Sequence, residues 1–141
     1  MKRIAITLRA VILFTVPFIS GCDSSEPQPE TERVKELLTA TEWKMQTVTV
    51  DGADQTSVYA GLRLSFTSSS YTATNGGAIW PASGTWSFAD ESGKMINRND
   101  GLQLTVDEVT AIKLALKLSW SKTTLGRVES VSGAHVFVFN K

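Results

Sequence analysis

The sequence has few of the residues on which most enzymes depend. Among its 141 residues there is one cysteine, Cys22, and one histidine, His135. A single cysteine excludes a disulfide within the chain. Nucleophilic catalysis requires a nucleophile and a base within reach of each other, and the sequence has no Gly-x-Ser-x-Gly elbow, phosphate-binding glycine loop or His/Cys ligand cluster. We therefore expect no enzyme, no metal site and no cofactor, and interpret His135 as an ordinary strand residue.

The chain has no excess of charge of either sign, with 14 basic and 14 acidic side chains. A nucleic-acid-binding domain would show a basic patch, so nucleic acid is not an expected partner. The adjacent acids Asp90-Glu91 and Asp107-Glu108 fall in predicted turns. Solvated charge is their ordinary role there, and a weak calcium site is the less favoured alternative.

Only one long apolar run is present, at residues 10–19, after a short basic segment. This length suits the apolar core of a secretory signal, whereas a membrane-spanning helix needs about 20 residues. The run ends in Ile19-Ser20-Gly21-Cys22, which resembles the lipobox of bacterial lipoproteins. The resemblance implies cleavage after Gly21 and acylation of Cys22, and two or three acyl chains would anchor the protein in a membrane. The alternative is an ordinary signal peptide with a chance cysteine.

The chain is predicted to divide into three parts. Residues 1–21 are the signal peptide, and residues 22–35 are the lipidated cysteine and a disordered acidic tether, because Asp23–Glu32 contains two prolines and no large apolar residue. Residues 36–141 form one domain. The expected location is the cell envelope, with the outer membrane favoured over the inner membrane and the leaflet left open. The membrane is therefore an expected partner through Cys22.

Thr31 to Thr39 has the spacing of a short helix capped by Thr31, with Val34, Leu37 and Leu38 on one face. Such a short helix is stable only when packed, so we expect it to lie against an opening of the domain. From Glu42 onwards, short alternating segments separated by turn residues predict eight strands. They are centred on residues 43–50, 62–66, 71–73, 84–88, 95–97, 102–106, 112–120 and 135–139.

The strand pattern predicts an all-β fold. Eight strands with one apolar face are enough to close on themselves, and closure removes the exposed edges. We expect an eight-stranded antiparallel up-and-down barrel with a short N-terminal helix, and a two-sheet sandwich is the alternative. A change of parity between Met45 and Val48 predicts a bulge in the first strand, and Asn99-Asp100-Gly101 predicts a tight hairpin connection.

The order of elements resembles the lipocalin-like domains of small bacterial lipoproteins. In those proteins a lipobox and tether precede a leucine-rich turn, a strand that opens on tryptophan, and an up-and-down barrel. The matching pieces are Leu37-Leu38 before Trp43, the Leu62/Leu64/Phe66 strand leading into Tyr71, Gly84-Thr85-Trp86, and the strand from Ile112 to Trp120. Thr41 stands where lipocalins usually have glycine. The resemblance covers nearly all of residues 36–141 and implies a lipocalin-like barrel.

Aromatic residues are the candidates for ligand binding. Trp43, Trp86 and Trp120 share an alternating face with aliphatic residues and should point inward. Trp80 lies in a predicted loop, where it could line a barrel mouth, contact a partner or pack on the core as a lid. The candidate ligand-binding residues are Trp80, Trp86, Trp120, Phe66 and Tyr71.

The side chains predicted to face inward are bulky, which favours a mostly filled interior with a shallow pocket at one end, bordered by aromatics such as Trp80. They are Trp43, Met45, Leu62, Leu64, Phe66, Trp86, Phe88, Leu102, Leu104, Ile112, Leu114, Leu116, Leu118 and Trp120. Two functions remain open. One is a lipoprotein that binds a small apolar ligand. The other is a structural or protein-interaction lipoprotein, including the protease-inhibitor type, with a filled barrel and no ligand.

Overall fold

The structure is a computed structural model that describes residues 26–121 and 132–141. Cys22, the predicted signal peptide, the start of the tether and the polar loop after Ser121 lie outside these residues. In chain order the described elements are α1 (Glu30–Thr39), β1 (Glu42–Val50), β2 (Ala53–Asp54), the 3-10 helix η1 (Thr56–Tyr59), β3 (Arg63–Phe66), β4 (Ser70–Thr74), β5 (Ser83–Phe88), β6 (Met95–Arg98), β7 (Gln103–Val109), β8 (Lys113–Trp120) and β9 (Gly133–Asn140).

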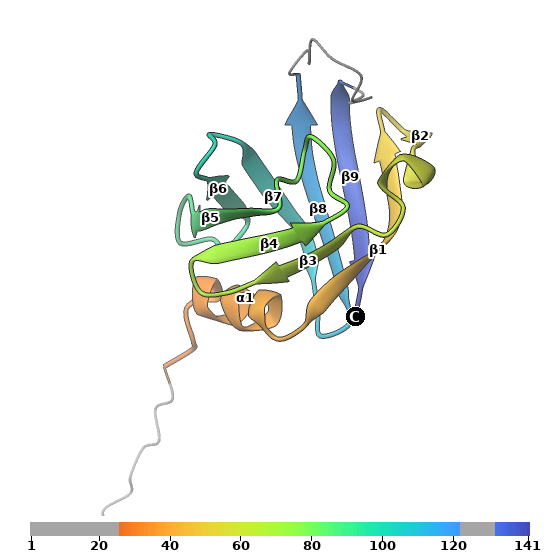
Figure 1. Cartoon of the computed structure of the whole chain (residues 1–141). Coiled ribbons are helices and arrows are strands. Elements are labelled where there is room, and N and C mark those ends of the chain that lie inside the picture. Colours follow the sequence, from red (N-terminus) through yellow and green to blue (C-terminus); the bar gives the residue numbers. More distant parts are fainter. Residues whose placement is uncertain (1–25, 122–131) are drawn as a thin grey trace, which may run out of the picture.

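The strands form a closed antiparallel barrel (Figure 1). Each strand from β3 to β9 pairs with its neighbour in the chain, and β1 pairs with both β3 and β9. This last pairing, which runs from Lys44↔Asn140 to Val50↔His135, closes the sheet and excludes the sandwich. The predicted eight-stranded barrel with one short helix is confirmed, and β2 is an additional two-residue strand paired with the end of β1.

Two predicted local features set the register of the barrel. The register of β1 against β9 shifts between Met45 and Thr47, which is the expected bulge and keeps Met45 and Val48 on the inner side. In the β6–β7 hairpin, the Gly101 amide donates to the Arg98 carbonyl oxygen at 3.0 Å. Gly101 has φ +83°, so a three-residue loop with glycine in the left-handed region makes the tight connection.

Helix α1 lies across one end of the barrel and contacts β3 and β7 (Figure 1). Val34 and Leu38 are buried, and the Leu38 carbonyl oxygen accepts a hydrogen bond from Trp43 Nε1 at 3.0 Å. The helix begins at Glu30 after Pro29, rather than with Thr31 as its cap. Residues 30–35 are therefore helical and not part of a disordered tether. Within the described part of the chain, no helix is both long and apolar enough to cross a membrane.

The inward side chains form one packed cluster, in agreement with the predicted filled interior. One member of the predicted inward set is wrong. Ile112 is 68% exposed, because it lies in the β7–β8 hairpin before β8 begins at Lys113. Thr110 Oγ1 accepts a hydrogen bond from the Lys113 amide at 3.0 Å and holds this turn. Alternation of residue types does not mark where a hairpin ends and a strand begins.

The two acid pairs have different surroundings. Asp90-Glu91 lies in the β5–β6 turn as predicted, and hydrogen bonds from Ser92 lower the pKa of Asp90. Asp107-Glu108 lies within β7 and not in a turn. Asp107 Oδ1 is 2.7 Å from Lys117 Nζ, and Glu108 Oε2 is 2.8 Å from Lys113 Nζ. Cross-strand ion pairs therefore account for the second acid pair.

Candidate functional site

The end of the barrel away from α1 is filled by a loop. We call residues 75–82, between β4 and β5, the plug loop. Its Ile79 and Trp80 are 0% and 1% exposed and belong to the core cluster. The Trp80 ring lies 6.0 Å from Tyr71 of β4 and 5.8 Å from Phe137 of β9, centroid to centroid. Two strands, β1 and β3, separate β4 from β9 around the barrel, so Trp80 spans the interior.

Glycines allow the plug loop to enter the barrel. A Cβ on Gly76 would lie 2.2 Å from Trp80 Cβ, and the Trp80 amide donates to the Gly76 carbonyl oxygen at 3.1 Å. A Cβ on Gly84 would lie 2.6 Å from the Tyr71 ring. Since real Cβ atoms do not approach other atoms so closely, both positions require glycine. The positions of the plug loop and of the Tyr71 ring therefore depend on these two glycines.

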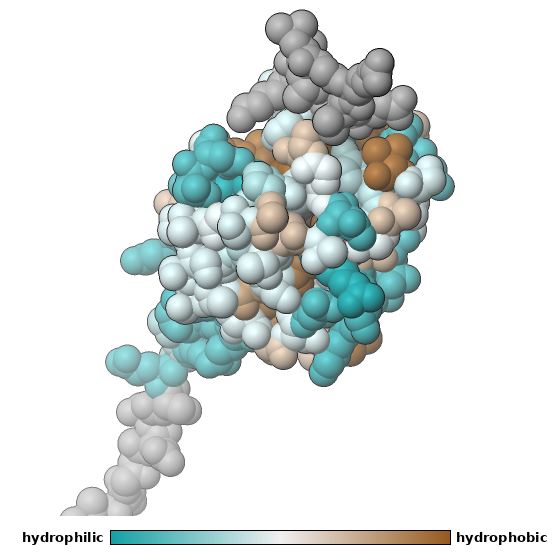
Figure 2. Space-filling view, in the orientation of Figure 1, coloured by the Kyte–Doolittle hydropathy of each residue, from teal (hydrophilic) through white to brown (hydrophobic). Residues whose placement is uncertain are grey.

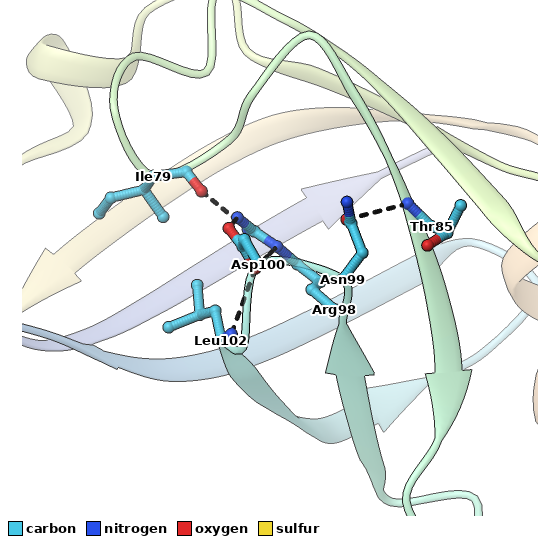
Figure 3. A network of polar contacts seen from close by, with 6 residues as sticks. All are labelled: Ile79, Thr85, Arg98, Asn99, Asp100 and Leu102. Atoms are coloured by element: carbon cyan, nitrogen blue, oxygen red, sulfur yellow. Dashed lines mark hydrogen bonds and ion pairs between the residues drawn. The ribbon is translucent and has the colours of Figure 1, made fainter.

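A buried arginine holds the plug loop in place (Figure 3). Arg98, at the end of β6, has a side chain that is 0% exposed. Its Nη1 donates to the Ile79 carbonyl oxygen at 2.7 Å. Its guanidinium carbon lies 5.4 Å from the Tyr71 ring centroid and 5.2 Å from that of Trp80. A cation over aromatic rings is stabilised by their electron-rich faces, most strongly when it is desolvated.

The charge of Arg98 is balanced by Asp100 in the adjacent hairpin. Arg98 Nε donates to Asp100 Oδ1 at 3.2 Å, and Arg98 Nη2 forms an ion pair with Asp100 Oδ2. Asp100 Oδ1 also accepts from the Leu102 amide, whereas Asn99 turns to the other side and accepts from the Thr85 amide (Figure 3). A buried guanidinium without a counter-charge would be strongly destabilising. The hairpin thus supplies the anion that makes a buried arginine tolerable.

At this end of the interior, some N–H donors have no acceptor among the described residues. A guanidinium has five N–H groups, and three of those on Arg98 are used by Asp100 and Ile79. Two therefore remain without an acceptor among the described residues. The buried Nε1 of Trp80 likewise has no hydrogen-bond partner there. Buried donors are nearly always paired with protein or water, so this region is suited to an additional oxygen acceptor.

Four of the five predicted ligand-binding residues lie together. The Phe66 ring is 6.4 Å from Tyr71 and 6.0 Å from Trp86, and Tyr71 is in contact with Trp80. Trp120 is at the end of β8 opposite Gly133 of β9, and no ring contact among described residues joins it to these four. Of the three predicted roles for Trp80, the structure shows a lid packed on the core.

Sequence reasoning missed Arg98. The signal was present, because Arg98 follows the inward-facing Ile96 by two residues and so lies on the same face of β6. An arginine is almost never fully buried unless it is paired, which made exposure the default expectation. Asp100, two residues later, is the pairing partner that allows Arg98 to be buried, and its presence in the sequence would have favoured burial over exposure.

His135 forms a second buried polar contact, with Tyr59 of η1. His135 is 1% exposed, and its Nδ1 lies 3.0 Å from the Gly133 carbonyl oxygen. Because a carbonyl can only accept, Nδ1 carries the proton, and Nε2 accepts from the Tyr59 hydroxyl at 3.2 Å. Burial lowers the pKa of His135 below its ordinary value of 6.5, against a smaller opposing effect of the Gly133 hydrogen bond.

This contact predicts a loss of stability in mild acid. Because the pKa of His135 is depressed in the folded state, the unfolded chain binds the proton more readily as the pH falls below 6.5. Its contribution is fully present above pH 6.5 and is lost as the pH falls through the lower pKa of the folded state. In urea titrations at a series of pH values, His135→Phe should show a flatter dependence than wild type just below pH 6.5. Equal slopes for the two proteins would contradict the buried neutral imidazole.

The outer surface offers a different chemistry from the interior. The outward positions of β4 and β5 are Ser70, which is half-buried, and Thr72, Thr74, Ser83, Thr85 and Ser87, which are exposed. The face that β3, β4 and β5 present is accordingly pale in Figure 2, the colour of intermediate hydropathy. A groove of about 470 Å³ lies against β7, β8 and β9 and another of about 290 Å³ against β5 and β6. Both are lined largely by outward-facing residues of these strands.

Within residues 26–121 and 132–141, no group of three or more His, Cys, Asp or Glu side chains could hold a metal ion. No protein-family model matches the chain, and no curated protein or solved structure matches it. What the site can bind must therefore follow from its own residues.

Proposed function

We propose that the protein is a lipid-anchored lipoprotein of the cell envelope, whose lipocalin-like barrel binds a small apolar ligand where Ile79 and Trp80 now lie. The role is binding and not catalysis. One observation carries the proposal: at this end the space between the strand side chains is filled by two residues of a loop, Ile79 and Trp80. A loop can move aside without unpairing any strand, and the space that it leaves is lined by Tyr71, Phe137 and Arg98.

The plug loop is held by few polar contacts. Among described residues, the two ends of the plug loop are held by hydrogen bonds from the Ala73 amide to the Ala82 carbonyl oxygen and from Asn75 Nδ2 to the Gly61 carbonyl oxygen. Between these ends, Arg98 Nη1 to the Ile79 carbonyl oxygen is the one hydrogen bond that joins residues 76–81 to the strands. The remaining attachment is apolar packing of Ile79 and Trp80. A ligand with an apolar body can replace that packing, which is non-directional. The proposed exchange is therefore between two apolar occupants of the same space.

The plug loop and helix α1 lie at opposite ends of the barrel, which suits a protein anchored through the residues before α1. Strand β6 runs from the turn at Gly93 to Arg98. A Cβ on Gly93 would lie 3.1 Å from Val34 of α1, so this end of β6 is beside the helix. The plug loop is at the other end of the same strand, where Ile79 accepts a hydrogen bond from Arg98. A lipid anchor at Cys22, before α1, would therefore leave the plug end facing away from the membrane. We favour the outer membrane over the inner membrane as the membrane that holds the anchor.

The test uses the full chain extracted from membranes and the neutral probe N-phenyl-1-naphthylamine, with native mass spectrometry to count bound molecules. Wild type should bind one molecule. Trp80→Ala should bind at least about tenfold more tightly, because a binding-competent state that is rarely populated weakens the apparent affinity of wild type. Thr72→Ala, on the exposed outer face of β4, is the matched control and should bind like wild type.

The second candidate is a structural or protein-interaction lipoprotein with a permanently filled barrel. The observation that favours it is the continuous set of ring contacts from Tyr71 through Trp80 to Phe137 and Phe139. In this case wild type would show no saturable binding even though Trp80→Ala accepts the probe in its new cavity. That result would reject the proposed ligand site, and cross-linking in intact membranes would then identify the partner.

A further inference from the structure

We infer that the interior site selects a ligand with an aromatic ring over a saturated ligand of the same carbon skeleton. The inference rests on the proposed function, because it requires a ligand in the place of Ile79 and Trp80. It adds the chemical class of that ligand, which follows from the groups that surround the Trp80 ring.

The Trp80 ring has two perpendicular aromatic neighbours, one from β4 and one from β9. Its plane makes an angle of 82° with the Tyr71 ring and of 83° with the Phe137 ring, at centroid distances of 6.0 Å and 5.8 Å. Such pairs set the positive edge of one ring against the negative face of the other, and they contribute beyond the area that they bury. A saturated ring has no such face or edge, so it would keep the burial and lose this contribution.

The third neighbour of the Trp80 ring is a cation. The Arg98 guanidinium carbon lies 5.2 Å from the centroid of the Trp80 ring and 5.4 Å from that of the Tyr71 ring. A guanidinium keeps its charge in proteins, and the Arg98 side chain is 0% exposed. The attraction between a cation and a ring face is strongest when the cation is desolvated. An aromatic ligand in this space would therefore make a contact that an alkyl group cannot make.

Transfer from water alone predicts the opposite order of affinities. Hydrophobic stabilisation is proportional to the apolar area removed from water. A saturated ring carries more hydrogen atoms, and so slightly more apolar area, than an aromatic ring with the same number of carbons. An interior that offered apolar burial alone would bind the saturated compound at least as tightly. A preference for the aromatic compound would therefore come from the ring contacts and the cation.

Biphenyl and bicyclohexyl provide a matched pair for the test. They have the same carbon skeleton and neither charge nor polar groups, so the ionic contacts of Arg98 act on both alike. Binding to the full lipidated chain is measured by native mass spectrometry in one detergent, and free concentrations are obtained from the measured partition of each compound into micelles. Wild type should bind biphenyl at least about tenfold more tightly than bicyclohexyl.

Two variants remove the proposed contacts one at a time. Arg98→Gln removes the cation, keeps an N–H donor for the Ile79 carbonyl oxygen, and should lower the preference for biphenyl at least about fivefold. Phe137→Leu removes one ring and should lower it at least about threefold. Any loosening of the plug loop would raise both affinities by the same factor and cancel in their ratio.

The matched control is Phe88→Leu, which removes a ring elsewhere in the barrel. Phe88 is the last residue of β5, at the end of that strand away from the plug loop, and its ring lies 5.1 Å from that of Trp86. This variant should keep the wild-type ratio. If Arg98→Gln does not fold by near-UV circular dichroism, Phe137→Leu decides, because cores tolerate exchanges between large apolar residues best.

The outcomes distinguish the inference from the proposed function. If N-phenyl-1-naphthylamine, biphenyl and bicyclohexyl all fail to bind to wild type, the interior site itself is rejected. If N-phenyl-1-naphthylamine binds but bicyclohexyl binds as tightly as biphenyl or more tightly, only the selectivity for an aromatic ligand is rejected. If biphenyl is preferred and the folded variants at Arg98 and Phe137 keep the wild-type ratio, or Phe88→Leu lowers it equally, these contacts are not its source and the inference is also overturned.

Discussion

Replacing Leu116 with alanine is expected to lower the free energy of unfolding by about 2–5 kcal/mol. Leu116 is 0% exposed in the middle of β8, where it pairs with Val106 of β7 and Phe137 of β9. Truncation removes buried methyl groups and leaves a cavity that two paired neighbours on a closed barrel cannot easily fill. Small domains are stabilised by about 5–15 kcal/mol in total, so urea titration should show a large shift of the midpoint.

Thr105→Ala is the matched control for this prediction. Thr105 is exposed on the outer face of β7, opposite Lys117 of β8. Its free energy of unfolding should change by no more than about 0.5 kcal/mol, as is usual for surface positions. Equal losses at Leu116 and Thr105 would mean that the inner and outer faces of these strands have been assigned the wrong way round.

Replacing Cys22 with serine is expected to abolish anchoring in the membrane. Cysteine supplies the sulfur to which the acyl chains of a lipoprotein are attached, and Cys22 is the only cysteine in the sequence. Each buried methylene contributes about 0.8 kcal/mol to membrane affinity, so the loss of two or three chains is decisive. In detergent phase separation, Cys22→Ser should move from the detergent phase to the aqueous phase.

The control is Ser24→Ala, two residues further along the predicted tether. This variant keeps the cysteine and should partition with the detergent like wild type. Intact mass measurement should show acyl chains on wild type and on Ser24→Ala and none on Cys22→Ser. A Cys22→Ser protein that partitions like wild type would place the anchor elsewhere in the chain.

The barrel was predictable because its strands alternate. Leu114, Leu116 and Leu118 face inward as their spacing indicates, and the bulge between Met45 and Thr47 appears where the parity changes. The errors fall at element ends. Ile112 keeps the parity of β8 but lies in a turn held by the local hydrogen bond between Thr110 and Lys113. Helix α1 begins at Glu30, where the acidic first turn with Glu30 and Glu32 suits a helix N-terminus. Alternation and apolar spacing, on which the prediction relied, do not mark these ends.

The candidate site was only half predictable. The aromatic residues Phe66, Tyr71, Trp80 and Trp86 could be selected from the sequence because apolar residues concentrate in a core. Arg98 could not be selected in the same way, since its burial depends on Asp100, on the carbonyl of a loop residue and on two rings from other elements. Such a combination exists only after the chain has folded.

The seam between β1 and β9 has a consequence for how the barrel forms. Lys44 pairs with Asn140, so the two edges that must meet come from the first and the last strand of the domain. Pairing between residues so distant along the chain carries a large loop-closure entropy, and proteins dominated by such pairing fold in milliseconds to seconds. The edges of β1 and β8 remain unpaired until β9 is available. A chain that lacks β9 would expose both edges to other chains, so the C-terminal strand protects the barrel from edge-to-edge aggregation during synthesis.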